Sequence, residues 1–104
     1  MIPEEIQNKL TDIKLLCSKH DVKSLYLFGS ATKHAIKDDS DYDFLVEINV
    51  LNEGYENYAN HFYELYDEFE ELLDRKVDLL TVNMMQNPYF IRSVEQSKVS
   101  LYEA

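Results

Sequence analysis

The sequence predicts a single α/β domain in which helices alternate with three or four strands. Stretches with helical and strand-like patterns take turns along all 104 residues, and this order is typical of strands placed side by side by crossover connections. A hydrophobic share of 45% and a charged share of 29% are ordinary for a globular protein. We therefore expect one domain over residues 1–104, with a core of modest size.

The helices are indicated by apolar residues that recur every three or four positions. We expect them at residues 3–19, 30–35, 54–73 and 88–96. Asn87 is placed to cap the last of these helices. In the long third helix, aromatic and leucine residues form one stripe and acids fill the other side. Tyr63 falls off that stripe, so we expect its ring to be exposed.

The strands are indicated by short apolar runs and by alternation. We expect them at residues 25–28, 41–48, 76–82 and 99–102. The run Leu25-Tyr26-Leu27-Phe28 fits a strand that is buried on both faces. In the second strand apolar and polar residues alternate, whereas the third is a core-like run interrupted by one aspartate. The last strand is expected at an edge of the sheet.

Charge and composition exclude several classes of function. With 20 acids against 10 bases, the net charge of −10 repels nucleic acid, because binding to nucleic acid depends on Lys and Arg. No apolar run approaches the roughly 20 residues that cross a bilayer, and the N-terminus does not resemble a signal peptide. The single cysteine, Cys17, cannot form an internal disulfide and is expected to be a small buried side chain. A cytoplasmic location follows as an expectation.

Three aspartates are the candidate metal ligands. Asp41 and Asp43 open the second strand and point to the same face, because side chains alternate along a strand. Asp78 interrupts the third strand, where a carboxylate without a partner would be costly to bury. If the two strands pair, the three carboxylates can bind two hard cations, Mg²⁺ or Mn²⁺. That arrangement serves phosphoryl and nucleotidyl transfer.

A Gly-Ser turn before the aspartates is the candidate phosphate site. Gly29 ends a strand, where a missing Cβ allows close approach of a ligand. Ser30 begins a short helix, whose free N–H groups favour phosphate, and Lys33 follows within reach. Each feature alone is weak: the turn is common, the acids around Asp43 could be a solvated loop, and Asp78 could pair with a neighbouring arginine. The combination is much more specific.

The segments FGS and DYDFLVE, with ten residues between them, resemble the signature of polymerase-β-like nucleotidyltransferases. The small size, the segment VDLLT and the tail IRSVEQSKVSLYE are similar to the minimal nucleotidyltransferase (MNT) branch. The resemblance implies a mixed sheet of three or four strands with helices packed on one face. It also implies phosphate binding by Gly29 and Ser30, and metal binding by Asp41, Asp43 and Asp78. Where this branch usually carries Arg-Gly, the chain has Lys33 and His34.

The resemblance further implies Mg²⁺, a nucleoside triphosphate, often ATP, and a helical HEPN-domain partner. The expected function is transfer of AMP to a hydroxyl of such a toxin, with the chain acting as antitoxin. A non-catalytic antitoxin that neutralises its partner by binding is the alternative, and transfer to a small molecule such as an aminoglycoside is a third. Assembly with the partner or with further copies stays open. His20 and His61 show no ligand spacing and are expected to be structural or exposed.

Overall fold

The computed structural model describes residues 2–29, 32, 41–49 and 54–104, and for residues 54–56 it describes the backbone only. The helix expected over residues 30–35 and the candidate residues Ser30 and Lys33 therefore lie outside the described residues. The elements are α1 (Glu4–Asn8), α2 (Leu10–Lys19), β1 (Val22–Phe28), β2 (Tyr42–Ile48), α3 (Gly54–Leu73), β3 (Val77–Thr81), the 3₁₀ turn η2 (Val82–Met84), α4 (Pro88–Ser97) and β4 (Val99–Glu103).

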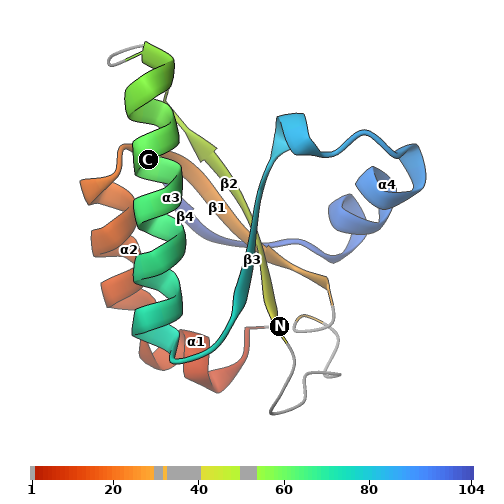
Figure 1. Ribbon diagram of the computed structural model, residues 1–104. Helices are drawn as coiled ribbons and strands as arrows, with labels where there is room; N and C mark the ends of the chain where they lie inside the picture. Colours follow the sequence, from red (N-terminus) through yellow and green to blue (C-terminus); the bar gives the residue numbers. More distant parts are fainter. Residues whose placement is uncertain (1, 30–31, 33–40, 50–53) are drawn as a thin grey trace.

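The strands form one mixed sheet in the order β3-β2-β1-β4, which runs through the middle of the molecule (Figure 1). β1 is antiparallel to both β2 and β4, whereas β2 and β3 are parallel. The parallel pair is possible because the long helix α3 carries the chain back from the end of β2 to the start of β3. The expected α/β class and the expected edge position of the last strand are confirmed.

The main core lies between the sheet and α1, α2 and α3. Its members are large apolar side chains from alternate strand positions and from one stripe of each helix: Ile6, Ile13, Leu25, Leu27, Phe44, Val46, Phe62, Leu65, Phe69, Leu79 and Leu101, among others. Cys17 is fully buried in the same core, as expected. Tyr63 lies off the stripe and is exposed, also as expected.

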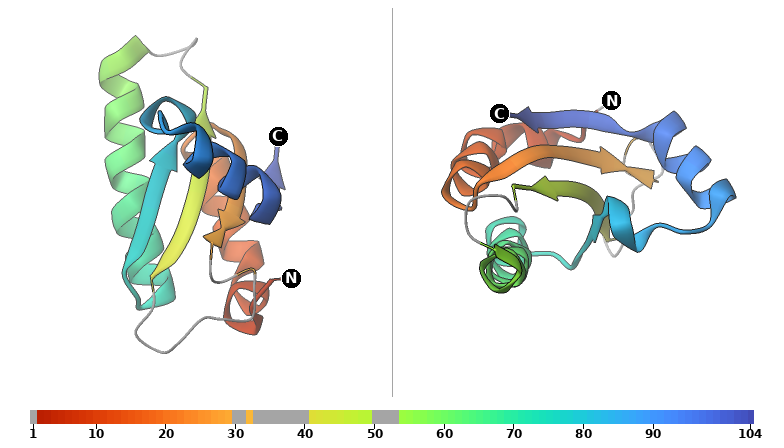
Figure 2. Two further views of the ribbon diagram at one scale, coloured as in Figure 1. Left: turned by 90° about the vertical axis from the view of Figure 1, so that its right-hand side faces the viewer. Right: turned by 90° about the horizontal axis from the view of Figure 1, so that it is seen from above.

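The expectation that helices pack on one face only is wrong for α4. A second, smaller cluster of Phe28, Leu45 and Val94 lies on the opposite face of the sheet, and Val94 comes from α4. Figure 2 accordingly shows α4 away from α2 and α3. The physical reason is that β1 is apolar on both faces, so its second face also needs a cover.

The first helix also differs from its expected form. The backbone at Lys9, with φ −109° and ψ 9°, divides the expected helix over residues 3–19 into α1 and α2. The apolar stripe survives this break, because Ile6 and Ile13 both remain buried. None of the helices in the described ranges combines the length and the apolar character that a membrane crossing needs.

Candidate active site

Asp43 and Asp78 lie directly beside each other in the sheet. They are register partners of the parallel strands β2 and β3, so their Cα atoms are about 4.8 Å apart and their side chains share a face. Asp41, two residues before Asp43, is exposed, as is Asp78, whereas Asp43 is half-buried. The two strands thus pair, as the predicted arrangement of the aspartates required, and the pairing places Asp78 level with Asp43. The crossover through α3 thus brings the carboxylates of Asp43 and Asp78, which are distant in the sequence, next to each other.

The electrostatics of the site show that the three acids influence one another. Burial, which is the largest cause, and the neighbouring charges of Asp78 and Asp41 together raise the pKa of Asp43 from 3.8 to about 6. Both effects disfavour a negative charge on Asp43 when no cation is near. Carboxylates that repel one another on an accessible face are a donor set that a divalent cation would stabilise.

Gly29 lies against Asp43, and its lack of a side chain is required there. Its backbone has φ +79°, a conformation that residues with a side chain rarely adopt. A Cβ at this position would lie only 2.6 Å from Oδ2 of Asp43. The N–H of Gly29 donates to Oγ of Ser97 at the end of α4 (3.2 Å), and the Thr32 hydroxyl donates to the Gly29 carbonyl (2.8 Å). The glycine therefore leaves room for the carboxylate, whereas the sequence had indicated room for a ligand.

The start of β2 is held by a group of side chains that the sequence did not reveal. Tyr42 stands between Asp41 and Asp43 in the sequence, and its hydroxyl donates a hydrogen bond to Oε2 of Glu5 (2.6 Å). The Arg75 guanidinium lies 4.8 Å from the centre of the Tyr42 ring and 3.6 Å from the same Glu5 oxygen. Burial, the hydrogen bond to Glu5 and the Glu5 charge raise the pKa of Tyr42 to about 12. The phenol thus stays neutral and can hold the strand in place.

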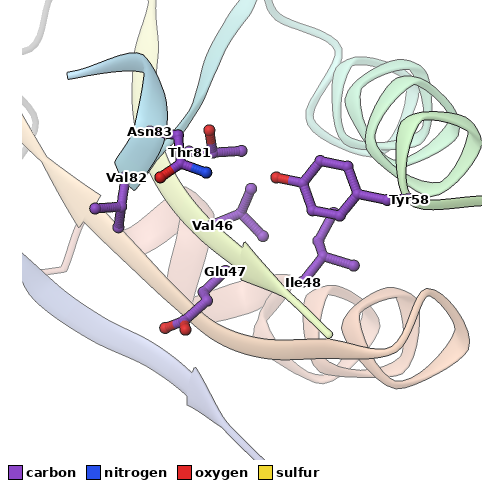
Figure 3. Close-up of a pocket in the computed structure, with 7 residues that line it drawn as sticks. All are labelled: Val46, Glu47, Ile48, Tyr58, Thr81, Val82 and Asn83. Carbon is purple, nitrogen blue, oxygen red and sulfur yellow. The ribbon is translucent and has the colours of Figure 1, made fainter. Parts of the chain in front are cut away.

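A separate hollow lies at the other end of the same strands. Figure 3 shows Tyr58 of α3 facing Val46 and Thr81, with Glu47, Ile48, Val82 and Asn83 completing the lining. Glu47 is four residues beyond Asp43, about 13 Å along the strand. Among the described residues, those that line the hollow include one acid and no lysine or arginine, and such a lining does not suit a triphosphate.

Neighbouring carboxylates on adjacent strands could hold two metal ions, and two-metal sites are typical of enzymes that transfer phosphoryl groups. The comparisons agree with this class. A family model described as "Polymerase beta, Nucleotidyltransferase" matches residues 11–104, and the chain belongs to this family. The family recognised in the sequence is confirmed.

Several curated relatives come from Methanocaldococcus jannaschii. "Putative protein adenylyltransferase MJ1379" is 36% identical over 86 residues, which cover 83% of each chain. The similarly named MJ0128 is 38% identical, also over 86 residues and 83% of each chain. Both relatives carry protein adenylyltransferase in their names, and the chain is similar to them over most of its length.

Solved structures share the fold. A structure described as "putative minimal nucleotidyltransferase" has a TM-score of 0.68 at 23% identity, covering 95% of both chains. A toxin–antitoxin crystal structure with AMP-PNP has a TM-score of 0.66 at 22% identity, covering 98% of this chain and 75% of that one. A Shewanella oneidensis complex of a tri-AMPylated HEPN toxin with an MNT antitoxin has a TM-score of 0.61 at 21% identity, covering 94% of this chain and 72% of that one.

Proposed function

We propose that the chain transfers AMP from ATP to a hydroxyl of a partner protein, a HEPN-domain toxin, and so acts as its antitoxin. The observation that carries the proposal is the pairing of Asp43 with Asp78, with Asp41 two residues away. Support for the donor and the acceptor comes from relatives named as protein adenylyltransferases and from similar folds described with AMP-PNP and with an AMPylated HEPN toxin. A cytoplasmic location, where ATP and Mg²⁺ are available, is part of the proposal.

The donor set fits a hard divalent cation. Asp41, Asp43 and Asp78 offer only carboxylate oxygens, which Mg²⁺ and Mn²⁺ prefer and softer metals do not need. The raised pKa of Asp43 fits as well, because a nearby cation would stabilise the carboxylate against both the burial and the repulsion that raise this pKa. When bound, such ions would polarise the phosphoryl group and stabilise the departing pyrophosphate.

The side chains of the site then have separate tasks. Asp43, half-buried with its carboxylate close to the glycine turn, is proposed to be a metal ligand. Asp78 is exposed and can accept a hydrogen bond from the acceptor hydroxyl. The hydroxyl oxygen attacks the α-phosphorus and its proton passes to water by way of the Asp78 carboxylate, while the bond to the bridging oxygen breaks and pyrophosphate leaves. Ser30 and Lys33 are proposed to bind the phosphates of ATP.

The test is transfer of radiolabel from the α-phosphate of ATP. The tag-free chain, the HEPN-domain product of a neighbouring gene and Mg²⁺ are incubated together, using the wild type, Asp41→Asn/Asp43→Asn and, as a matched control, Asp67→Asn on the exposed side of α3. The proposal expects label on the partner with the wild type and with Asp67→Asn, and none with the double variant. Label that persists in the double variant would contradict it.

A second function, neutralisation by binding alone, is favoured by one specific observation. Tyr63 of α3 and Leu15 of α2 are 67% and 64% exposed, and exposed aromatic and aliphatic side chains are frequent in the centre of protein interfaces. In the same experiment this function predicts no label at all. Toxicity of the partner would then be suppressed equally by the wild type and by the double variant.

A further inference from the structure

Two histidines that are far apart in the sequence meet at the end of the molecule where α2 leads into β1. His20 follows α2 as its C-cap, and His61 and Glu64 lie one turn apart on α3. The two Nδ1 atoms are 3.0 Å apart, and Oε2 of Glu64 is 3.8 Å from Nδ1 of His20. This contact could not be predicted from the sequence, because 41 residues separate the histidines.

The surroundings of His20 determine which of its ring nitrogens is available. Its side chain is only 1% exposed, and its Nε2 lies 3.1 Å from Oε1 of Glu68. A carboxylate only accepts hydrogen bonds, so Nε2 carries the hydrogen. In the neutral ring the lone pair is therefore on Nδ1, which faces His61. Lys19 also contacts Oε1 of Glu68 (3.1 Å) and helps to fix that carboxylate.

This arrangement has the parts of a metal site with an outer carboxylate. Histidine ligands in metal sites usually donate their second N–H to a carboxylate, which fixes the ring and makes it a better ligand. Glu68 is in that position relative to His20. His61 and Glu64 add a second imidazole and a carboxylate, and one ligand atom from each of the three residues lies within 4.8 Å of the others.

The spacing also fits one ion. Ligand atoms around a tetrahedral Zn²⁺ are roughly 3.3 Å apart, given bonds of about 2.0–2.1 Å. The 3.0 Å between the two Nδ1 atoms and the 3.8 Å to the Glu64 oxygen lie on either side of that value. The Glu64 side chain is 62% exposed, so it can turn toward an ion at little cost, whereas His20 is already held in place.

We propose that His20, His61 and Glu64 bind a divalent transition-metal ion, best matched by Zn²⁺, with water as the fourth ligand. Two imidazoles with one carboxylate suit Zn²⁺ better than Mg²⁺, which prefers oxygen ligands. For the ion to bind, His61 carries its hydrogen on Nε2, so that Nδ1 becomes a ligand. The ion would tie the end of α2 to the middle of α3 and stabilise the fold.

This site is distinct from the aspartate site. His20 precedes Val22 at the start of β1, whereas Asp43 is the register partner of Phe28 at the other end of the same strand. Six residues of β-strand span about 20 Å. The two sites can therefore be altered independently, and a test of one need not depend on the other.

The experiment is a calorimetric titration of the tag-free chain with ZnCl₂. It is done in the Asp41→Asn/Asp43→Asn background, so that the aspartate site contributes little and the outcome does not depend on nucleotidyl transfer. His61→Gln and Glu64→Gln each remove one ligand at a position that is not fully buried. Glu71→Gln, an exposed acid on the same helix outside the cluster, is the matched control. Circular dichroism verifies that each variant is folded.

We expect one Zn²⁺ per chain in the parent and in Glu71→Gln, and a loss of affinity of roughly tenfold or more in both ligand variants. Co²⁺ should give the visible absorption of a tetrahedral ion in the parent and in Glu71→Gln but in neither ligand variant, and Zn²⁺ should raise the melting temperature of the parent. If saturable binding were absent, or if either ligand variant bound with unchanged affinity, the pair of histidines would be an ordinary hydrogen-bonded contact and the proposal would be wrong.

Discussion

Replacing Asp43 with asparagine should stabilise the metal-free protein at neutral pH. The carboxyl has a pKa of about 6 in the fold against an ordinary value of 3.8, a difference of about 3 kcal/mol at about 1.4 kcal/mol per pKa unit. Because Asp43 is only half-buried, solvent screening reduces this to about 1–2 kcal/mol. A raised carboxyl pKa destabilises the fold above pH 6, and this cost disappears as the pH falls from about 6 toward 4.

The assay is thermal unfolding in EDTA at pH 7.5 and at pH 4, with Asp67→Asn as the control. For a domain of this size we expect Asp43→Asn to melt roughly 5–10 °C above the wild type at pH 7.5, and the difference to vanish at pH 4. Saturating Mg²⁺ should raise the melting temperature of the wild type and not that of the variant. A variant that melts at or below the wild-type temperature in EDTA at pH 7.5 would show that the Asp43 carboxylate does not destabilise the fold.

Three further substitutions test the supports of the site and the core. Gly29→Ala should lower the free energy of unfolding by about 1–3 kcal/mol and also reduce AMP transfer, because the new Cβ would lie 2.6 Å from Oδ2 of Asp43 and the backbone φ is +79°. Wild-type stability of this variant in urea unfolding would contradict the expected clash. Phe44→Ala, at a fully buried position, should cost about 3–5 kcal/mol in the same urea assay, whereas a loss below about 1 kcal/mol would mean that the core is packed differently. Asn87→Ala should lower the free energy of unfolding by about 1 kcal/mol, because Oδ1 of Asn87 accepts hydrogen bonds from the N–H groups of Tyr89 and Phe90. Asn87→Ser should keep most of that stability, because serine also caps helices. Equal stability of the wild type and both variants would exclude a stabilising cap.

The local patterns of the sequence were enough to predict the elements that build the aspartate site. Alternation along 41–48 assigned Phe44 to the core face and Asp43 to the other, and the structure agrees. The long apolar stripe of α3 predicted a crossover, which makes β2 and β3 parallel neighbours. Only the exact pairing of Asp43 with Asp78 needed the structure, because a register is set by packing over the whole sheet.

The contacts between distant segments could not be predicted in this way. Periodicity shows which face of an element is apolar, but it does not show which partner covers that face. The position of α4 on the second face of the sheet, the contact of Glu5 with Tyr42 and the meeting of His20 with His61 are all of this kind. Gly29 is an intermediate case, since its turn was evident but the reason for it, the carboxylate of Asp43, was not.

In the proposed function, the carboxylates of Asp41, Asp43 and Asp78 bind metal together at the site of nucleotidyl transfer. The most direct measurement is anomalous diffraction from crystals grown with Mn²⁺ and a non-hydrolysable ATP analogue, because Mn²⁺ scatters anomalously and has the same preference for oxygen as Mg²⁺. We predict Mn²⁺ bound by Asp41 and Asp43, with Asp78 contributing to one of the ions, and the analogue's phosphates beside Gly29. Nucleotide bound elsewhere, or Mn²⁺ that contacts none of the three aspartates, would contradict the claim.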